Sequence, residues 1–243
     1  MIPVDSLLYK IDQRLNKLSS NEHQEIQLED KILALNEAQL KLIKTKVSGI
    51  SVPSKLGFDS FKKRYQDIQG LIVNFDKNTL TLTEADPIIN RWEAQLSKLN
   101  PEYMLYADAY ILATKGVCKD KVIWVNKDLL KHGDLKELLH NDNFKPSFEY
   151  EETFNSISDG MISIFTDGTF TPKTIHVLYI RYPEYIDKVG YIKFDGEESV
   201  NTDCELESYL EDELLDLTVA NLADFTENMS AAQTARNRSQ TNE

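Results

Sequence analysis

The spacing of apolar residues changes twice along the chain, and this change restricts the fold more than any other feature of the sequence. Apolar residues recur every three to four positions in residues 4–18 and 25–47, which predicts two amphipathic helices. Residues 103–182 are instead rich in Tyr, Ile, Val and Trp, with glycine-containing turns, which predicts strands. Helical spacing returns in residues 205–229. The pattern therefore predicts an α+β protein.

A short polar segment separates the first two predicted helices, so we expect an N-terminal antiparallel helical hairpin. The long C-terminal helix is expected to pack on this hairpin and complete a helical body. In the middle of the chain, residues 103–116 and 118–128 are predicted to form a β-hairpin. Residues 161–165 and 174–182 form two further predicted strands around a hairpin-type dipeptide, Asp167–Gly168. We expect this antiparallel β-rich region to be sandwich-like or barrel-like.

These patterns divide the chain into four predicted segments. Residues 1–100 form the helical body with a linker or arm, and residues 101–203 form the β-rich domain. Residues 204–229 form the helix that packs on the body, and the small polar residues of 230–243 form a flexible tail. Within these segments we expect short helices at 59–69 and 87–99 and a last short strand at 189–194.

The negative charge of the chain is concentrated near its C-terminus. The net charge is −13, and residues 194–235 contain 12 acidic residues and no Lys or Arg. A broad basic patch that would bind nucleic acid is therefore not expected. No apolar run reaches the roughly 18–20 residues of a membrane helix, and the N-terminus does not resemble a secretory signal. We expect a protein that is made in a cytoplasm and does not associate with a membrane.

The predicted helix at 205–229 carries two apolar stripes. The second stripe consists of Leu215, Val219, Leu222, Phe225 and Met229. A helix that is apolar on two sides has to be covered from two sides. Either the helix is buried within its own domain, over the N-terminal hairpin, or the second stripe contacts a neighbouring subunit. In a closed ring, the acidic segment would recur around the axis and repel DNA phosphates; alternatively, the charge provides only solubility.

The sequence contains no catalytic motif. Phosphate-binding loops, nucleophile elbows and HExxH zinc helices are absent. A small hydrolase would have to use His132, Asp134, His140 or the carboxylates of residues 149–152, for which a solvated surface is the alternative. We therefore expect no enzyme activity, no cofactor and no metal site.

Three blocks of sequence, in this order, resemble a known family. They are "DSLLYKIDQRLNKLSSNE…LNEAQLKLIK", "FTDGTFTPKTIHVLYIRYPEYID" and "DCELESYLEDELLDLTVANLADFTEN". Together they resemble head-to-tail connector proteins, the adaptor or neck-ring proteins of tailed bacteriophages, and are most similar to structural ring proteins of crAss-like phages that infect Bacteroides. The resemblance covers most of the chain and is weakest over residues 52–99.

The resemblance implies a virion protein that is assembled in the host cytoplasm. It implies a ring, typically of twelve copies, in the neck between the portal protein and other neck or tail rings, with DNA passing through without sequence-specific binding. Residues 5–47 and 206–229 would build the ring body, residues 161–182 would face the tail, and Arg236 and Arg238 would contact the portal. The alternatives are a tail-associated receptor- or carbohydrate-binding protein, with stacking surfaces on the aromatic strands of residues 103–124, and the hydrolase.

Overall fold

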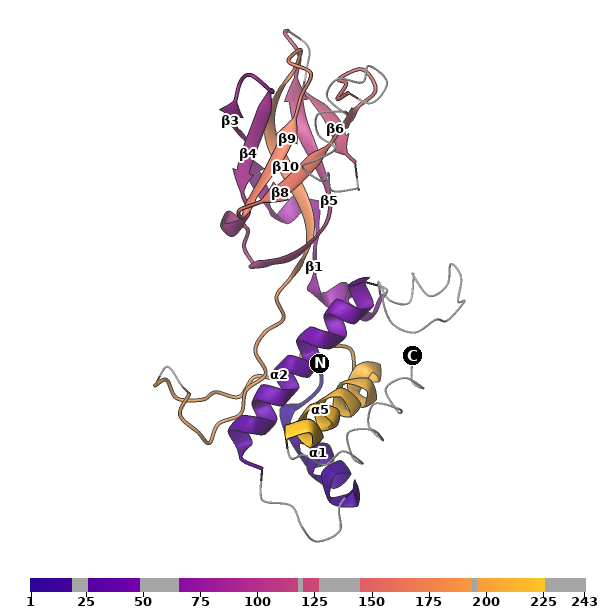
Figure 1. The fold of residues 1–243 in the computed structure, drawn as a ribbon, viewed down its shortest axis with the longest axis vertical. Helices are drawn as coiled ribbons and strands as arrows, with labels where there is room; N and C mark the ends of the chain where they lie inside the picture. The colour runs from indigo at the N-terminus through magenta and orange to yellow at the C-terminus, as the bar shows by residue number, and fades with distance from the viewer. Residues whose placement is uncertain (19–25, 49–65, 118–119, 127–144, 194–195, 226–243) are drawn as a thin grey trace, which may run out of the picture. The chain divides into compact units, whose positions relative to one another are not determined.

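The chain folds into two compact units, shown in a computed structural model (Figure 1). The structure describes residues 1–18, 26–48, 66–117, 120–126, 145–193 and 196–225. The helical unit comprises Met1–Gly70 and Pro183–Glu243, and the β unit comprises Leu71–Tyr182. The α+β class predicted from the sequence is confirmed, with helices from both ends of the chain packed together and two sheets between them in sequence.

The described part of the helical unit contains three α-helices. They are α1 (Val4–Leu18), α2 (Leu28–Ser48) and α5 (Glu211–Phe225), and a short 3-10 helix, η4 (Ser208–Leu210), leads into α5. Helix α5 packs against both α1 and α2 (Figure 1). The core between them is aliphatic and contains Leu7, Ile11, Ile32, Leu35, Leu42, Ile43 and Leu214. The burial of these positions explains the three-to-four spacing in the sequence.

The C-terminal helix begins later than the sequence predicts. The backbone N–H and C=O groups of Cys204 bond to Ile2, at N···O distances of 3.0 and 2.8 Å, in an isolated antiparallel bridge. This pairing holds the chain extended at residue 204, so α5 starts only after η4.

The β unit is a sandwich of two sheets. A six-stranded sheet has the order β1-β10-β5-β6-β7 with β2 also on β10, and a four-stranded sheet has the order β3-β4-β9-β8. All pairs are antiparallel except β6–β7. The strands are β1 Ile72–Val73, β2 Thr79–Thr81, β3 Thr83–Asp86, β4 Arg91–Gln95, β5 Tyr103–Thr114, β6 Lys121–Val125, β7 Glu152–Thr153, β8 Asn155–Ser158, β9 Met161–Phe165 and β10 Thr171–Arg181.

Side chains alternate across the central strands of the sandwich. In β5, Ala109, Ile111 and Ala113 are buried, whereas the residues between them are partly exposed. The buried set joins Ile162 and Ile164 of β9 in one apolar core. This period of two is the pattern that predicted strands here.

The helix predicted at residues 87–99 is wrong. Strand β4 occupies residues 91–95 and pairs with β9, with Trp92 opposite Ile164. Asn90 precedes it with a φ of 51°, a left-handed conformation that cannot lie inside an α-helix. Strands β1–β4 therefore lie in residues that the sequence assigned to the helical body with its linker or arm. The helix predicted at 59–69 lies mostly outside the described residues.

Two further predictions about strands are also wrong. The Asp167–Gly168 turn forms, with Gly168 at a φ of 79°, but it connects β9 of one sheet to β10 of the other. It is a corner of the sandwich and not a hairpin, because β9 already pairs with β4 and β8. The strand predicted at 189–194 is reduced to one isolated bridge, between Ile192 and Glu198.

Candidate functional site: a braced loop and an aromatic sheet face

Four acidic residues of α5 are ion-paired to the two N-terminal helices. The pairs are Lys10–Glu211, Arg14–Asp212, Arg14–Asp216 and Lys46–Glu213, with N···O distances of 2.7, 2.6, 2.5 and 2.8 Å. Asp216 and Glu213 are buried, so these pairs are partly shielded from solvent. Three cations of the N-terminal helices, Lys10, Arg14 and Lys46, thus offset most of the charge of these four carboxylates within the helical unit, a role that neither sequence-based interpretation included.

The described part of the second apolar stripe of α5 is buried within the chain. Leu215, Val219 and Leu222 are at most 1% exposed. The prediction that they form an oligomer interface is wrong, because a side chain already buried in its own subunit cannot also contact a neighbour. Burial within its own domain, the other interpretation of this helix, is confirmed for these residues. The side chain of Phe225, and all of Met229, lie outside the described part of the chain.

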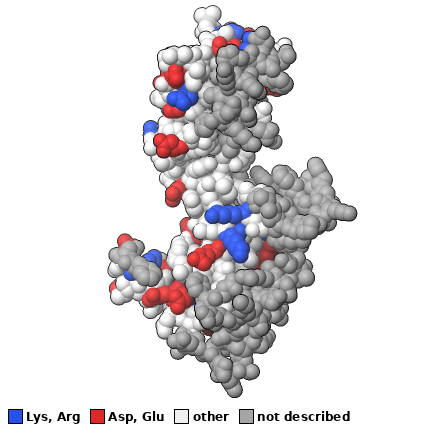
Figure 2. All heavy atoms as spheres, in the orientation of Figure 1, with Lys and Arg blue, Asp and Glu red and all other residues white. Residues whose placement is uncertain are grey.

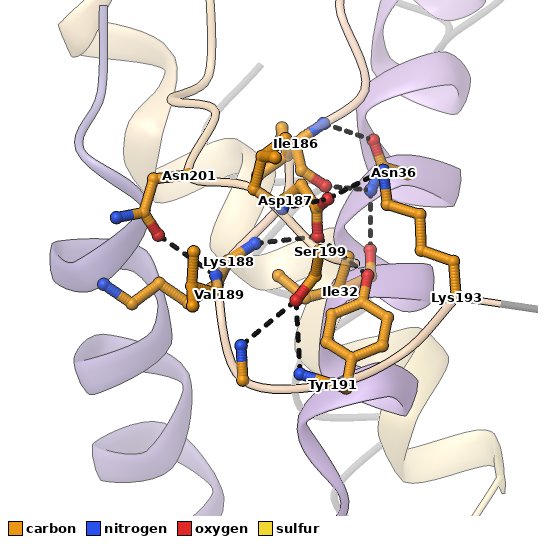
Figure 3. A network of polar contacts seen from close by, with 12 residues as sticks. Ile32, Asn36, Ile186, Asp187, Lys188, Val189, Tyr191, Lys193, Ser199 and Asn201 are labelled. Carbon is orange, nitrogen blue, oxygen red and sulfur yellow. Dashed lines mark hydrogen bonds and ion pairs between the residues drawn. The ribbon is translucent and has the colours of Figure 1, made fainter. Parts of the chain in front are cut away.

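A loop of the helical unit, residues 183–203, is held together by one buried carboxylate (Figure 3). Asp187 is 1% exposed. Its carboxylate accepts hydrogen bonds from the Tyr191 hydroxyl at 2.8 Å and from the backbone N–H groups of Lys188 and Val200 at 2.8 and 3.0 Å. The ammonium of Lys193 lies 3.0 Å away. Four donors thus converge on one side chain from both arms of the loop.

The charge state of this centre follows from its surroundings. Burial would raise the pKa of Asp187, but the bonds from Val200, Lys193, Tyr191 and Lys188 outweigh burial, so its pKa lies below the usual value. Burial and the bond to Asp187 both raise the pKa of Tyr191 above its usual value. The negative charge therefore stays on the aspartate and the proton on the tyrosine at neutral pH.

The loop is fixed to α2 by a buried asparagine (Figure 3). The Asn36 side-chain nitrogen donates to the carbonyl oxygens of Ile32 and Ile186, at 2.8 and 2.9 Å. Its side-chain oxygen accepts from the Ile186 N–H at 2.9 Å. Within the loop, the Ser199 hydroxyl oxygen accepts from the N–H groups of Gly190 and Tyr191. These bonds, together with the buried side chain of Ile186, set the backbone conformation of the loop.

Four of the side chains that this braced backbone presents to solvent are apolar or aromatic. Tyr185, Val189, Ile192 and Val200 are between 51% and 68% exposed. Three exposed glutamates, Glu184, Glu197 and Glu198, lie in the same loop. A fixed backbone with a group of exposed apolar side chains is typical of a docking surface. Sequence reasoning assigned part of this loop to a strand and missed the surface. The available signal was a set of apolar residues without helical or strand spacing beside Gly190 and Gly196.

The β unit has a different surface, an aromatic patch on the outer side of the six-stranded sheet. The ring of Tyr110 stacks on His176 with centroids 4.6 Å apart and lies 5.5 Å from Trp124. Phe75 contacts the same cluster, 5.2 Å from Tyr110 and 6.1 Å from Trp124. Trp124 is 49% exposed. The expected aromatic surface of residues 103–124 is therefore present, with additional members from β10 and from the 3-10 helix η2 (Phe75–Lys77).

The carboxylates proposed for a hydrolase do not form a cleft. Glu149 and Glu151 lie on the surface and pair with Lys115 and Lys121, at 2.5 and 2.9 Å. The bond from Lys115 lowers the pKa of Glu149, opposite to the change that a general acid needs. Glu152 is exposed in β7.

The remaining candidate residues of the sequence analysis, His132, Asp134, His140, Arg236 and Arg238, lie outside the described residues. Within the described ranges, no group of three or more His, Cys, Asp or Glu side chains could hold a metal ion. None of the described helices is both long enough and apolar enough to cross a membrane.

The surface charge of the described residues has both signs. On the face drawn in Figure 2, acidic and basic side chains of the described residues are interspersed and do not form one broad basic field.

Family models and curated proteins do not identify a family for this chain. No protein-family model matches the sequence, and the search of curated proteins finds no matching relative.

Proposed function

We propose that this chain is a structural protein of a phage virion that forms an oligomeric ring in the neck, between the portal and the tail. The resemblance of the three sequence blocks suggests the class of protein, and the ring of twelve copies comes from that resemblance alone. The ring leaves a channel through which DNA passes without sequence-specific contacts. Its partners are further copies of itself, the portal protein and the adjacent neck or tail rings. No catalytic step is assigned to it.

The observation that supports this proposal best is the braced 183–203 loop. Four exposed apolar side chains on a backbone fixed by a buried charge centre are suited to association with another chain, because a preorganised surface loses less conformational entropy on binding. We therefore reassign the interface from α5, where Leu215, Val219 and Leu222 are buried, to this loop.

The test is assembly in the presence of the portal protein encoded by the same genome. The chain and the portal are produced together, and the mass of the complexes is measured by mass photometry and their symmetry by electron microscopy. The expected result is a ring whose mass increment is an integer multiple of 27.9 kDa. A chain that remains monomeric and does not bind the portal would contradict the proposal.

One observation favours a second function, recognition of a carbohydrate or receptor by the β unit. The exposed ring of Trp124 beside Tyr110 and His176 is a surface on which a sugar ring could stack. Titration with host surface oligosaccharides, followed by tryptophan fluorescence, tests this function. A saturable change that is lost in Trp124→Ala would support it, and an unchanged spectrum would count against it.

A further inference from the structure

The helical unit carries two complementary surfaces, from which we infer that the 183–203 loop of one copy binds the outer face of α2 on the next copy. The inference rests on the proposed function, because it specifies how the proposed ring is held together. It follows from the charges and exposed apolar groups of the two surfaces.

The first surface is acidic and apolar. Besides its four exposed apolar side chains, the loop presents Glu184, Glu197 and Glu198 to solvent. Its two lysines are occupied inside the helical unit, since Lys188 pairs with Asp5 at 2.7 Å and Lys193 pairs with Asp187 at 3.0 Å. The loop therefore presents net negative charge around its apolar groups.

The second surface is the outer face of α2 in the C-terminal half of that helix, which is basic and apolar. Lys41, Lys44 and Val47 are exposed there, and Leu40 is half-buried beside them. Positions 40, 44 and 47 recur at helical spacing on one side, and position 41 adjoins them. Residues 38–48 contain no Asp or Glu, and the exposed Glu37, one turn before Lys41, offsets only one of the two lysines. This outer α2 face therefore has a net charge of opposite sign to the loop.

The signs of these charges determine which surfaces can meet. If loop paired with loop, at least six glutamates would meet, and a pairing of α2 with α2 would bring four lysines together. Such like-charge contacts are unfavourable. Loop-to-helix contact avoids this repulsion, and where it is head-to-tail and its rotation closes, it repeats from copy to copy and generates a ring. The two surfaces thus favour loop-to-helix contact over contact between like surfaces, and the ring itself comes from the proposed function.

Charge reversal tests the contact without altering the core. The loop variant carries Glu184→Lys and Glu198→Lys, and the helix variant carries Lys41→Glu and Lys44→Glu. All four side chains are exposed, so both variants should fold. Each variant alone should need at least about a tenfold higher concentration to assemble on the portal than the original chain, because like charges now face each other.

The matched control reverses two exposed charges of the β unit, Lys77→Glu and Glu84→Lys. It carries as many reversals as each test variant but leaves both proposed surfaces unchanged. It should therefore assemble on the portal at the same concentration as the original chain.

A mixture of the two variants gives the decisive result. A reversed loop matches a reversed helix face, and an original loop matches an original helix face, so alternating copies satisfy every contact. Assembly of the mixture should return to the level of the original chain, which also shows that both variants are folded. Assembly should weaken as NaCl is raised from about 0.05 to about 0.5 M, because salt screens exposed charges.

The possible failures are distinguishable. Normal assembly of either variant alone, or failure of the mixture to assemble, would overturn the loop-to-helix contact while leaving the ring intact as a function. An original chain that neither assembles nor binds the portal would overturn the proposed function and this contact together.

Discussion

The two units of the chain are stabilised in different ways. The β unit is a sandwich whose core is apolar, with Ile111 of one sheet and Ile162 and Ile164 of the other buried together. The helical unit adds buried charged groups to its apolar core, among them Asp187 in the loop and Asp216 on α5. The β unit exposes aromatic rings on a regular sheet, whereas the helical unit exposes aliphatic groups on an irregular loop.

This difference shows what each surface needs from the residues beneath it. A sheet face is flat and supported by the strand ladder, so alternation of side chains is enough to place Tyr110 and Trp124 side by side. An irregular loop has no ladder, and its backbone N–H groups need other acceptors. Asp187, Asn36 and Ser199 supply those acceptors.

The largest expected effects come from a pair of core substitutions, one in each unit. Ile111→Ala and Leu214→Ala each remove a fully buried side chain and should lower the free energy of unfolding of their own unit by about 2–5 kcal/mol.

The chain contains two tryptophans, Trp92 and Trp124, and both lie in the β unit. The described α-helices all lie in the helical unit. Urea unfolding followed by tryptophan fluorescence and by circular dichroism at 222 nm therefore reports on the two units separately.

Ile111→Ala should shift the fluorescence transition, and Leu214→Ala should shift the dichroism transition. The matched controls are Val122→Ala and Leu33→Ala, at partly exposed positions of the same units, which should change the unfolding free energy by no more than about 0.5 kcal/mol. If each core substitution shifted both transitions equally, the two units would unfold as one, and the comparison between them would fail.

A smaller effect is expected from Asp187→Asn. The amide nitrogen cannot accept the bonds that the carboxylate accepts, so buried donors lose their partner, at a cost of about 1–3 kcal/mol. Hydrogen exchange should accelerate at the amides of Val200 and Thr202, which both bond to residue 187, and the β unit should exchange as before. Lys115→Met, at an exposed ion pair of the β unit, is the control. Unchanged exchange in the loop would show that Asp187 does not brace it.

The comparison also explains which parts of the molecule could be predicted from the sequence. The period of two in residues 103–114 and the helical spacing in residues 4–18 and 28–48 result from burial on one side, and they correctly predict β5, α1 and α2. The period of two does not show which strands pair with each other. The sequence therefore indicates β9 and β10, but not that the turn at Gly168 separates them into two sheets.

The docking loop could not be predicted, because its order depends on contacts between residues far apart in the sequence. Asn36 lies 150 positions from Ile186, and their two hydrogen bonds fix the loop to α2. The packing of α5 could not be predicted from the sequence either. Its two apolar stripes are visible in the sequence, but whether α1 and α2 cover both depends on tertiary packing. Local patterns alone therefore favoured an oligomer interface where the structure has a core.

Acid should loosen the braced loop once Asp187 takes up a proton. A carboxylate whose pKa is lower in the folded state than in the unfolded state stabilises the protein above the unfolded value, near pH 3.9 for aspartate, and this contribution is lost as the pH falls through the folded pKa. The amide resonances of the loop should therefore stay constant from about pH 7 to about pH 5 and change below about pH 4. In Asp187→Asn this change should be absent. A loop that titrates equally in the variant would assign the effect to another carboxylate.

The smallest effect is expected from an exposed ion pair of the β unit. Lys115 pairs with the exposed carboxylate of Glu149, and exposed pairs contribute little to stability because water and salt screen them. Lys115→Met should therefore leave the midpoint of the fluorescence transition nearly unchanged, in contrast to Asp187→Asn in the loop. The contrast depends on burial and on the number of donors, since Asp187 accepts bonds from Lys188, Tyr191 and Val200 besides its ion pair. A loss of stability in Lys115→Met as large as that of the core variant would mean that surface charge stabilises the sandwich as well, and the distinction between the two units would disappear.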